Sequence, residues 1–171
     1  RTVTPKPVTT LINTHSHGDH THGNFMFADS AIIGSELCRR EVIASGTRAH
    51  ALFPMIEFGD CPVTPPTVTF EDRLSVYVDD LRVELIFVGP AHTTNDIIAW
   101  IPERKLLFSG DVIFNGGTPF ALGGSVGGWL EALDVVTSRA AKRACANSSA
   151  ARRSRRERAS APSPTTSVRT A

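Results

Sequence analysis

Cysteine is scarce in this sequence, which has three cysteines in 171 residues and no Cys-x-x-Cys pair. Cys38, Cys61 and Cys145 are odd in number and widely spaced, which argues against a disulfide framework and against a thiolate zinc knuckle. No apolar run reaches the length of a membrane span, and no signal peptide is visible. We therefore expect a cytoplasmic protein with no membrane partner.

Acidic residues are nearly missing from the C-terminal part of the chain. Residues 139–171 carry nine Arg or Lys and one acidic residue, a net charge of +8. Residues 1–138 hold the other nine of 18 basic and 16 of 17 acidic residues, a net of −7. Because 139–171 is rich in Arg, Ala and Ser and has no apolar period, we expect it to be disordered. The predicted organisation is a folded domain over 1–138 and a basic tail over 139–171.

Two explanations of this tail are open. Random-frame translation of G+C-rich DNA gives such Arg-, Ala- and Ser-rich sequence, and we favour the hypothesis of a frame-shifted or misassembled end of a gene fragment. The alternative is a genuine basic tail that contacts nucleic acid or membrane by charge. The tail has no aromatic residue, which removes the stacking expected of a single-strand binder. We therefore do not expect a nucleic-acid partner.

The first 138 residues are enough for one domain with a hydrophobic core. Short apolar runs predict strands, and these runs are 8–13, 31–34, 74–78, 81–89, 96–102 and 105–111. Asp79-Asp80 joins two of them as a hairpin, and Pro102-Glu103-Arg104 forms the turn between the last two. Together with the helical segments described next, the order is a mixture of strands and helices, which predicts an α/β layered domain.

Two segments are expected to be helical. Residues 35–46 begin with Ser35, a plausible N-cap, and end at Gly46. Residues 129–136 also have helical spacing. Between these elements, 47–69 contains four prolines and is expected to be an irregular connection with at most one helical turn. Residues 116–128 contain six glycines and are expected to form a mobile or closely packed loop.

Four of the six histidines lie in a single loop, THSHGDHTHGN, at 14–24. His15 and His17 are separated by one residue, so in an extended segment they project to the same side. Asp19 and His20 follow directly, and Gly18 permits a tight backbone between the two pairs. Four ligands this close crowd one tetrahedral ion but can serve two adjacent ions. The loop therefore predicts a metal site that needs further ligands from elsewhere.

His92 and Asp111 are the distant residues that best complete such a site. Each comes just after a predicted strand, and strand ends at one edge of a sheet are where α/β folds place their ligands. Taken alone, His92 would be a hydrogen-bonded loop histidine and Asp111 a turn or capping aspartate. The histidine loop makes the metal-site interpretation stronger for both.

Three further polar residues near these segments have less specific predictions. His22, just past the loop, is expected to form hydrogen bonds rather than to bind metal, and His50 is expected at the surface. Asp96, four positions after His92, is a candidate either to orient a ligand imidazole or to form a turn.

These residues carry a family resemblance. HSHGDH resembles the HxHxDH signature of the metallo-β-lactamase-fold hydrolases, His92 in AHTTND is similar to the family's next histidine motif, and Asp111 in FSGD resembles its bridging aspartate. The resemblance covers roughly residues 8–138 and implies an αββα sandwich with a two-metal centre in a cleft along one edge. The resemblance also implies how the ligands divide between the two metal ions. His15, His17 and His92 would form site one, and Asp19, His20 and Asp111 would form site two, with Asp111 bridging the ions.

The chemistry implied by the resemblance is metal-dependent hydrolysis of a small molecule. Two zinc ions fit the ligand set, and iron or manganese also suits mixed carboxylate and imidazole ligands. A metal-bound hydroxide would attack an ester, thioester, lactone or similar bond, with Asp19 and Asp111 as the catalytic carboxylates. The chain has an aspartate, Asp111, where a cysteine or serine could stand. In this respect it resembles the glyoxalase-II-type hydrolases more than the true β-lactamases. The substrate, the metal and the oligomeric state stay open.

The sequence departs from the family pattern at both ends. Family members begin with several strands before the HxHxDH loop, whereas about seven residues precede the first predicted strand here. They also end with a further histidine that completes site two, and no histidine follows His92. We therefore expect a sandwich that is incomplete at its N-terminus and C-terminus. Alternatives are a non-catalytic or weakly active fragment that binds one metal ion, and a nucleic-acid-acting member with a basic tail.

Overall fold

The computed structural model describes residues 5–139. The chain divides into two compact units, residues 1–135 and 136–171, and the sheets described below lie in the first. The predicted basic tail lies outside the described residues apart from Arg139, so its disorder and its proposed boundary stay predictions. No helix in the part of the chain that the structure describes has the length and apolar character needed to cross a membrane.

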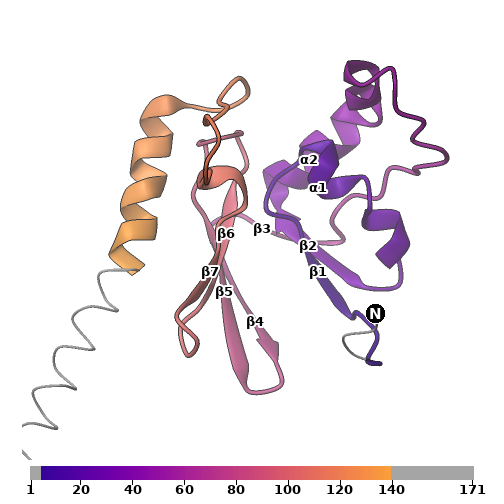
Figure 1. The fold of residues 1–171 in the computed structure, drawn as a ribbon. Coiled ribbons are helices and arrows are strands. Elements are labelled where there is room, and N and C mark those ends of the chain that lie inside the picture. The colour runs from indigo at the N-terminus through magenta and orange to yellow at the C-terminus, as the bar shows by residue number, and fades with distance from the viewer. Residues whose placement is uncertain (1–4, 140–171) are drawn as a thin grey trace, which may run out of the picture. The chain divides into compact units, whose positions relative to one another are not determined.

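Two β-sheets form the first unit (Figure 1). The first is parallel, in the order β1 (Thr10–Ile12), β2 (Ala31–Ser35) and β3 (Val68–Phe70). The second is antiparallel, in the order β4 (Arg73–Val78), β5 (Leu81–Phe87), β6 (Ile97–Ile101) and β7 (Leu106–Phe108). The register places Leu11 opposite Ile32 and Leu85 opposite Ala99. The predicted hairpin and the predicted turn at 102–104 are both present.

Helix α2 (Glu36–Ser45) begins and ends where the sequence predicts. The Ser35 hydroxyl accepts a hydrogen bond from the Cys38 backbone N–H at 3.1 Å, which is the contact expected of an N-cap. Gly46 follows the last turn with a positive φ of 54° and donates its N–H to the Val42 carbonyl. The helix packs on β2 and β3.

The other helical segments are mostly single turns. They are α1 (Gly18–Thr21), η1 (Asn24–Phe27), η2 (Arg48–Leu52) and η3 (Gly110–Val112). A longer helix begins at residue 126 and continues to 139, which includes the predicted helical stretch. Its Trp129 indole N–H donates to the Val112 carbonyl at 2.8 Å, so the helix is attached close to the end of β7.

The hydrophobic core lies between the two sheets. Its buried members come from both sheets and are Ile33, Phe70, Val83, Leu85, Ile97, Ala99 and Ile101. Strand β6 is buried along most of its length, whereas β4 alternates between exposed and half-buried residues. This pattern agrees with the sequence, in which 97–101 is a continuous apolar run and 73–78 alternates. The core holds the strand ends in fixed positions.

Strand β3 was not predicted. It lies in the proline-containing segment that the sequence indicated as irregular, and its three residues pair in parallel with β2. The pairing is extended by Thr67, directly before the strand, whose backbone N–H donates to the Ile32 carbonyl at 2.7 Å. A three-residue strand whose partner lies more than 30 positions away leaves no periodic pattern in the local sequence.

Both cysteines that the structure describes are free thiols. Cys38 is fully buried in α2, and burial raises the pKa of its thiol to about 12, with the Glu41 and Asp96 carboxylates adding to the effect. Cys38 is therefore an inert core residue at neutral pH. Cys61 is half-buried and donates to the Phe58 carbonyl.

Candidate metal centre

The predicted ligands follow strands from both sheets. His15 comes shortly after β1 of the first sheet, whereas His92 and Asp111 come after β5 and β7 of the second. The Ile97 N–H at the start of β6 donates to the Thr14 carbonyl at 2.9 Å, which joins the histidine loop to the second sheet. The core therefore brings the three loops together at one edge, as expected for strand ends.

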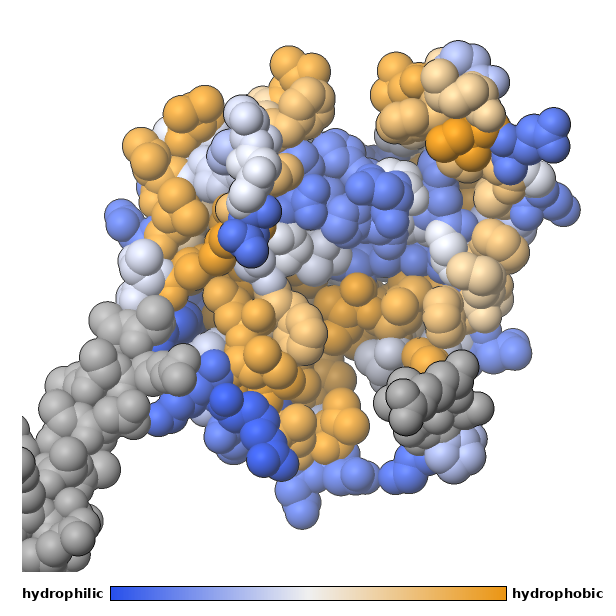
Figure 2. Space-filling model, viewed as in Figure 1, coloured by the Kyte–Doolittle hydropathy of each residue, from blue (hydrophilic) through white to orange (hydrophobic). Residues whose placement is uncertain are grey.

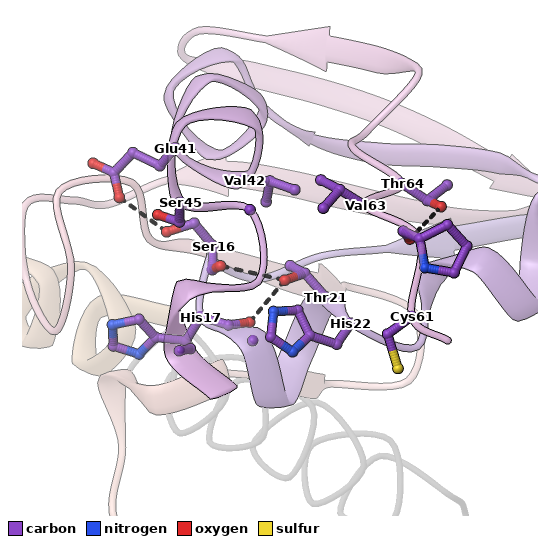
Figure 3. A pocket seen from close by; sticks show the side chains of 14 residues that line it. Ser16, His17, Thr21, His22, Glu41, Val42, Ser45, Cys61, Val63 and Thr64 are labelled. Carbon is purple, nitrogen blue, oxygen red and sulfur yellow. Dashed lines mark hydrogen bonds between the residues drawn. The ribbon is translucent and has the colours of Figure 1, made fainter. Parts of the chain in front are cut away.

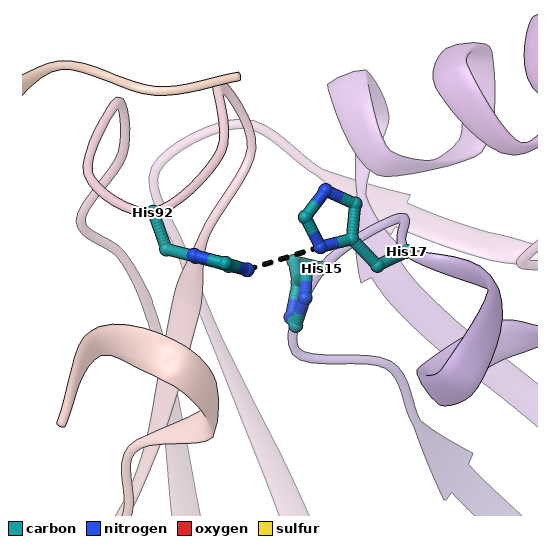
Figure 4. A group of neighbouring side chains, drawn as sticks. All are labelled: His15, His17 and His92. Atoms are coloured by element: carbon teal, nitrogen blue, oxygen red, sulfur yellow. Dashed lines mark hydrogen bonds between the residues drawn. The ribbon is translucent and has the colours of Figure 1, made fainter. Parts of the chain in front are cut away.

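Four histidines and one aspartate meet at this edge. The ligand atoms of His15, His17 and His92 all lie within 4.8 Å of one another. The ring of His92 points towards that of His17 (Figure 4), with 3.0 Å between His92 Nε2 and His17 Nδ1. A second group, His15, His20 and Asp111, also has its ligand atoms within 4.8 Å. Each of these two clusters of side chains can hold a metal ion.

Asp111 reaches both groups with its two carboxylate oxygens. Its Oδ1 lies 3.3 Å from His20 Nε2, and its Oδ2 lies 3.6 Å from His92 Nε2. Gly110, directly before it, has a φ of 51°, and a Cβ there would lie 2.7 Å from the Thr14 side chain. Only glycine accepts this conformation and this close approach at low cost. The turn after β7 therefore places Asp111 against the histidine loop.

Asp19 differs from the other predicted ligands. Its carboxylate lies 3.3 Å from His20 Nε2, but its side chain is 77% exposed. It belongs to neither of the two ligand groups found among residues 5–139. The structure thus places Asp19 next to the site, on the side that faces solvent. Its predicted role as a metal ligand stays a prediction.

The electrostatics of His15 suit a metal cation. Burial, followed by the nearby imidazoles of His20, His17 and His92, lowers the pKa of His15 to about 2. Its ring is therefore neutral, which is the form that binds metals. His15 Nδ1 contacts Thr14 Oγ1 at 3.2 Å, whereas His15 Nε2 is buried and has no hydrogen-bond partner. A buried lone pair among other acceptors is costly, and a cation there would satisfy it.

The imidazoles of His17 and His92 also have features that favour metal binding. Burial lowers the pKa of His17, as does the neighbouring His92. The Phe120 carbonyl oxygen is close to His92 Nδ1, and because a carbonyl only accepts, Nδ1 must carry the proton. In the neutral ring the lone pair is then on Nε2, which faces His17 Nδ1 and the Asp111 carboxylate. The aromatic rings of Phe114 and Trp129, each 5.8 Å away between centroids, enclose the His92 ring.

A buried amide pair closes the histidine loop. The Asn13 and Asn24 side chains exchange hydrogen bonds of 3.0 and 2.8 Å. Asn13 also donates to the His20 carbonyl at 3.1 Å, and Asn24 to the Thr64 carbonyl at 2.9 Å. Both side chains are almost fully buried. The loop thus has fixed ends, a role that the sequence analysis did not assign to either asparagine.

The Asn24→Ala variant should therefore be markedly less stable. It leaves Asn13 Oδ1 and the Thr64 carbonyl without their donor, at a cost of roughly 1–3 kcal/mol for each buried group. We expect the free energy of unfolding, measured with urea, to fall by about 2–4 kcal/mol. Asn115→Ala, at an exposed position, is the matched control and should change it by less than about 0.5 kcal/mol. Equal stability of the two variants would contradict the role of the amide pair.

Asp96 acts on the backbone around His92 and not on a ligand imidazole. Its Oδ2 accepts hydrogen bonds from the N–H groups of Ala91 and Thr93, at 3.2 and 2.7 Å. These residues flank His92 on both sides, so Asp96 fixes the shape of the loop. Of its two predicted roles, the turn role is the one that the geometry shows.

His22 and His50 contact each other instead of the ligands. His22 Nδ1 lies 3.1 Å from His50 Nε2, and the His50 ring stacks on Phe58. Neither residue belongs to the ligand groups found in residues 5–139. The His22 ring covers Gly18 so closely that a Cβ at that position would overlap it. A side chain at position 18 would therefore have to displace the His22 ring.

Comparison with known proteins agrees with the site. A family model described as the metallo-beta-lactamase superfamily matches residues 1–147. The chain belongs to this superfamily.

The relatives of this superfamily member have names that describe different activities. It is 36% identical over 116 residues to the 2,4-dinitroanisole O-demethylase subunit alpha of Nocardioides sp. (strain JS1661), covering 66% of this chain and 31% of the relative. It is 32% identical over 126 residues to the hydroxyacylglutathione hydrolase of Rhodospirillum rubrum. This match covers 74% of this chain and 42% of the relative. The chain thus spans less than half the length of either relative.

Solved structures of the superfamily share the fold. A metallo-beta-lactamase from Pontibacter korlensis matches with a TM-score of 0.60 at 19% sequence identity, covering 78% of this chain and 57% of that one. The predicted αββα sandwich, incomplete relative to the full length of the fold, is confirmed by this match.

Proposed function

We propose that this superfamily member is a metal-dependent hydrolase with a two-metal centre at the edge where its sheets meet. The observation that carries the proposal is the convergence of His15, His17, His20, His92 and Asp111. The buried, unpartnered Nε2 of His15 adds to it, because a cation is the simplest partner for converging acceptor atoms.

The geometry supports the predicted division of ligands. We assign His15, His17 and His92 to the first ion, since all three belong to one group. His20 and Asp19 would hold the second, and Asp111 would contribute to both, because its two oxygens face His92 and His20 separately. His15 belongs to both groups, and we assign it to the first ion, where it completes a set of three imidazoles. Zinc fits this donor set, and iron or manganese would also fit its carboxylates.

Bound zinc would supply Lewis-acid activation of a water molecule and of the substrate's scissile group. The chain's own residues position these groups. The exposed Asp19 carboxylate faces the site beside His20, so we assign it to accept a hydrogen bond from the attacking water. The Phe120 carbonyl holds the His92 ring in one tautomer, and the aromatic side chains around His92 exclude water from that side.

Exposed apolar side chains near the ligands favour a substrate with an apolar part. Phe120, which touches His92 through its backbone, is 53% exposed, and Leu122 is 86% exposed. The surface drawn in Figure 2 carries both hydrophobic and hydrophilic residues. We propose small molecules with an ester, thioester or lactone bond as substrates. The relatives' names justify including 2,4-dinitroanisole and a glutathione thioester among the compounds tested.

The test is hydrolysis of a panel of these compounds by the 171-residue chain, before and after metal removal. We expect turnover of at least one compound, its loss with a chelator, and its return on addition of zinc. His50→Ala should behave like the wild-type chain because His50 lies outside the ligand groups. Zinc binding without turnover of any compound would refute the hydrolase and favour a metal-binding fragment. Turnover that persists without metal would refute the two-metal centre.

A further inference from the structure

Glu41 is a half-buried carboxylate that the proposed function does not use. It lies on α2 and forms part of the wall of a cavity of about 210 Å³ beside Ser16 and His17 (Figure 3). It belongs to neither ligand group in the described part of the chain. Its position next to a proposed ligand raises the question of what it does there.

Both carboxylate oxygens of Glu41 accept hydrogen bonds. Oε2 accepts from the Ser16 hydroxyl at 2.9 Å and from the Asn95 side-chain amide at 2.9 Å. Oε1 accepts from the Thr94 hydroxyl. Ser16 and Asn95 are 8% and 0% exposed, so two of the three donors are shielded from water. Charge-assisted hydrogen bonds of this kind are the stronger ones.

These donors belong to the two loops that carry the proposed ligands of the first ion. Ser16 stands between His15 and His17 in the sequence. Thr94 and Asn95 follow His92 by two and three positions. The Asn95 amide also donates to the Ser16 hydroxyl at 3.0 Å, which joins the loops to each other. Glu41 therefore connects α2 to both loops at once.

The start of α2 also contacts the segment after His92. The Ser35 hydroxyl, which caps α2, donates to the Asn95 carbonyl at 3.0 Å. The N-cap of α2 and the carboxylate on its second turn thus hold the same residue. The Asp96 carboxylate, in contrast, accepts from the N–H groups of Ala91 and Thr93, which flank His92. The Glu41 carboxylate thus bonds to both loops, whereas the Asp96 carboxylate bonds to one.

We propose that Glu41 is a positioning residue that sets the spacing between the His15–His17 segment and His92. This spacing is 3.0 Å between His17 Nδ1 and His92 Nε2. The inference rests on the proposed function, because these imidazoles matter as a pair only if they share a metal ion. Partners of this kind, which hold ligands without touching the metal, affect metal affinity by about 10- to 100-fold.

The two substitutions of Glu41 differ in a useful way. Glu41→Ala removes the acceptor for all three donors and leaves the buried Asn95 amide with the Ser16 hydroxyl as its nearest acceptor. Glu41→Gln keeps one oxygen, which can accept from Asn95 and Ser16, while its NH2 group donates to the Thr94 hydroxyl. The zinc affinity should therefore fall by about 10- to 100-fold in Glu41→Ala and by clearly less in Glu41→Gln.

The experiment measures zinc affinity by chelator competition, together with the visible absorption spectrum of the cobalt-substituted protein. Cobalt reports the ligand geometry, so displaced imidazoles should change the spectrum of Glu41→Ala. The matched control is Glu36→Ala on the same helix, which removes an exposed ion pair with Arg40 at 3.0 Å. It should leave affinity and spectrum unchanged. Thermal unfolding of each metal-free variant is measured in parallel.

The outcomes separate this inference from the proposed function. A wild-type chain that binds neither zinc nor cobalt would overturn both. A wild-type chain that binds them, with Glu41→Ala matching it in affinity and spectrum, would overturn the inference alone. A lower unfolding temperature without any change of affinity or spectrum would show a merely structural role and would also overturn it. If Glu41→Ala does not fold, Glu41→Asp decides, because its side chain keeps the charge but is one methylene too short to reach all three donors at once. Wild-type affinity and spectrum in that variant would overturn the proposal.

Discussion

Replacing His15 by alanine is expected to abolish tight zinc binding. His15 is the one residue common to both ligand groups in the described part of the chain, and it is fully buried. Its loss leaves two imidazoles for the first ion and opens a cavity beside the second. We expect the affinity for the first ion to fall by more than about 100-fold, which exceeds the usual effect of residues that only support ligands.

Elemental analysis of the purified variant, with chelator competition, measures this effect. His50→Ala is the matched control, because it removes an imidazole that contacts His22 and Phe58 but no proposed ligand. Circular dichroism establishes that both variants are folded. If His15→Ala keeps the zinc content of the wild-type chain, the proposed centre is wrong.

The Asp111→Asn variant should keep the fold and lose the second ion together with most of the activity. The amide has nearly the shape of the carboxylate but no negative charge, so it cannot compensate two neighbouring cations. Its NH2 group would also face either His20 Nε2 or His92 Nε2, where an oxygen now lies at 3.3 or 3.6 Å. We expect hydrolysis to decrease by about 100-fold or more.

Calorimetric titration with zinc and initial rates on the compound turned over by the wild-type chain measure the two effects. Asp60→Asn, at an exposed position, provides the same chemical change away from the site and should have no effect. Full metal content and full activity in Asp111→Asn would mean that Asp111 is only a turn residue.

The parts of the fold that the sequence predicts are those with local signals. Ser35 and Gly46 mark the ends of α2 through the hydrogen-bonding capacity of one and the permitted positive φ of the other. The proposed ligands share this property, since a cluster of imidazoles within one loop is informative by itself. His92 and Asp111 are recognised because each ends an apolar run.

The supporting residues have no such signal. Glu41 looks like an ordinary charged residue of a surface helix, and its two donors from the His92 loop lie more than 50 positions away. Asn13 and Asn24 are 11 positions apart and their pairing depends on how the loop closes. Asp96 was recognised as relevant, but whether it would face a ring or a backbone N–H depends on the path of the loop. These contacts follow from tertiary structure, which local sequence does not encode.

The origin of the ligands on two different sheets has a thermodynamic consequence. His15 and His17 follow a strand of the first sheet, and His92 and Asp111 follow strands of the second, so a chain in which the sheets have separated offers no complete set of ligands. A metal that binds only the native arrangement adds its binding free energy to the stability of the fold, about 2.7 kcal/mol when the free ion is at 100 times its dissociation constant. The zinc concentration around the chain would then control how firmly the two halves of the sandwich hold together. Core substitutions far from the ligands would in turn weaken metal binding by loosening that association.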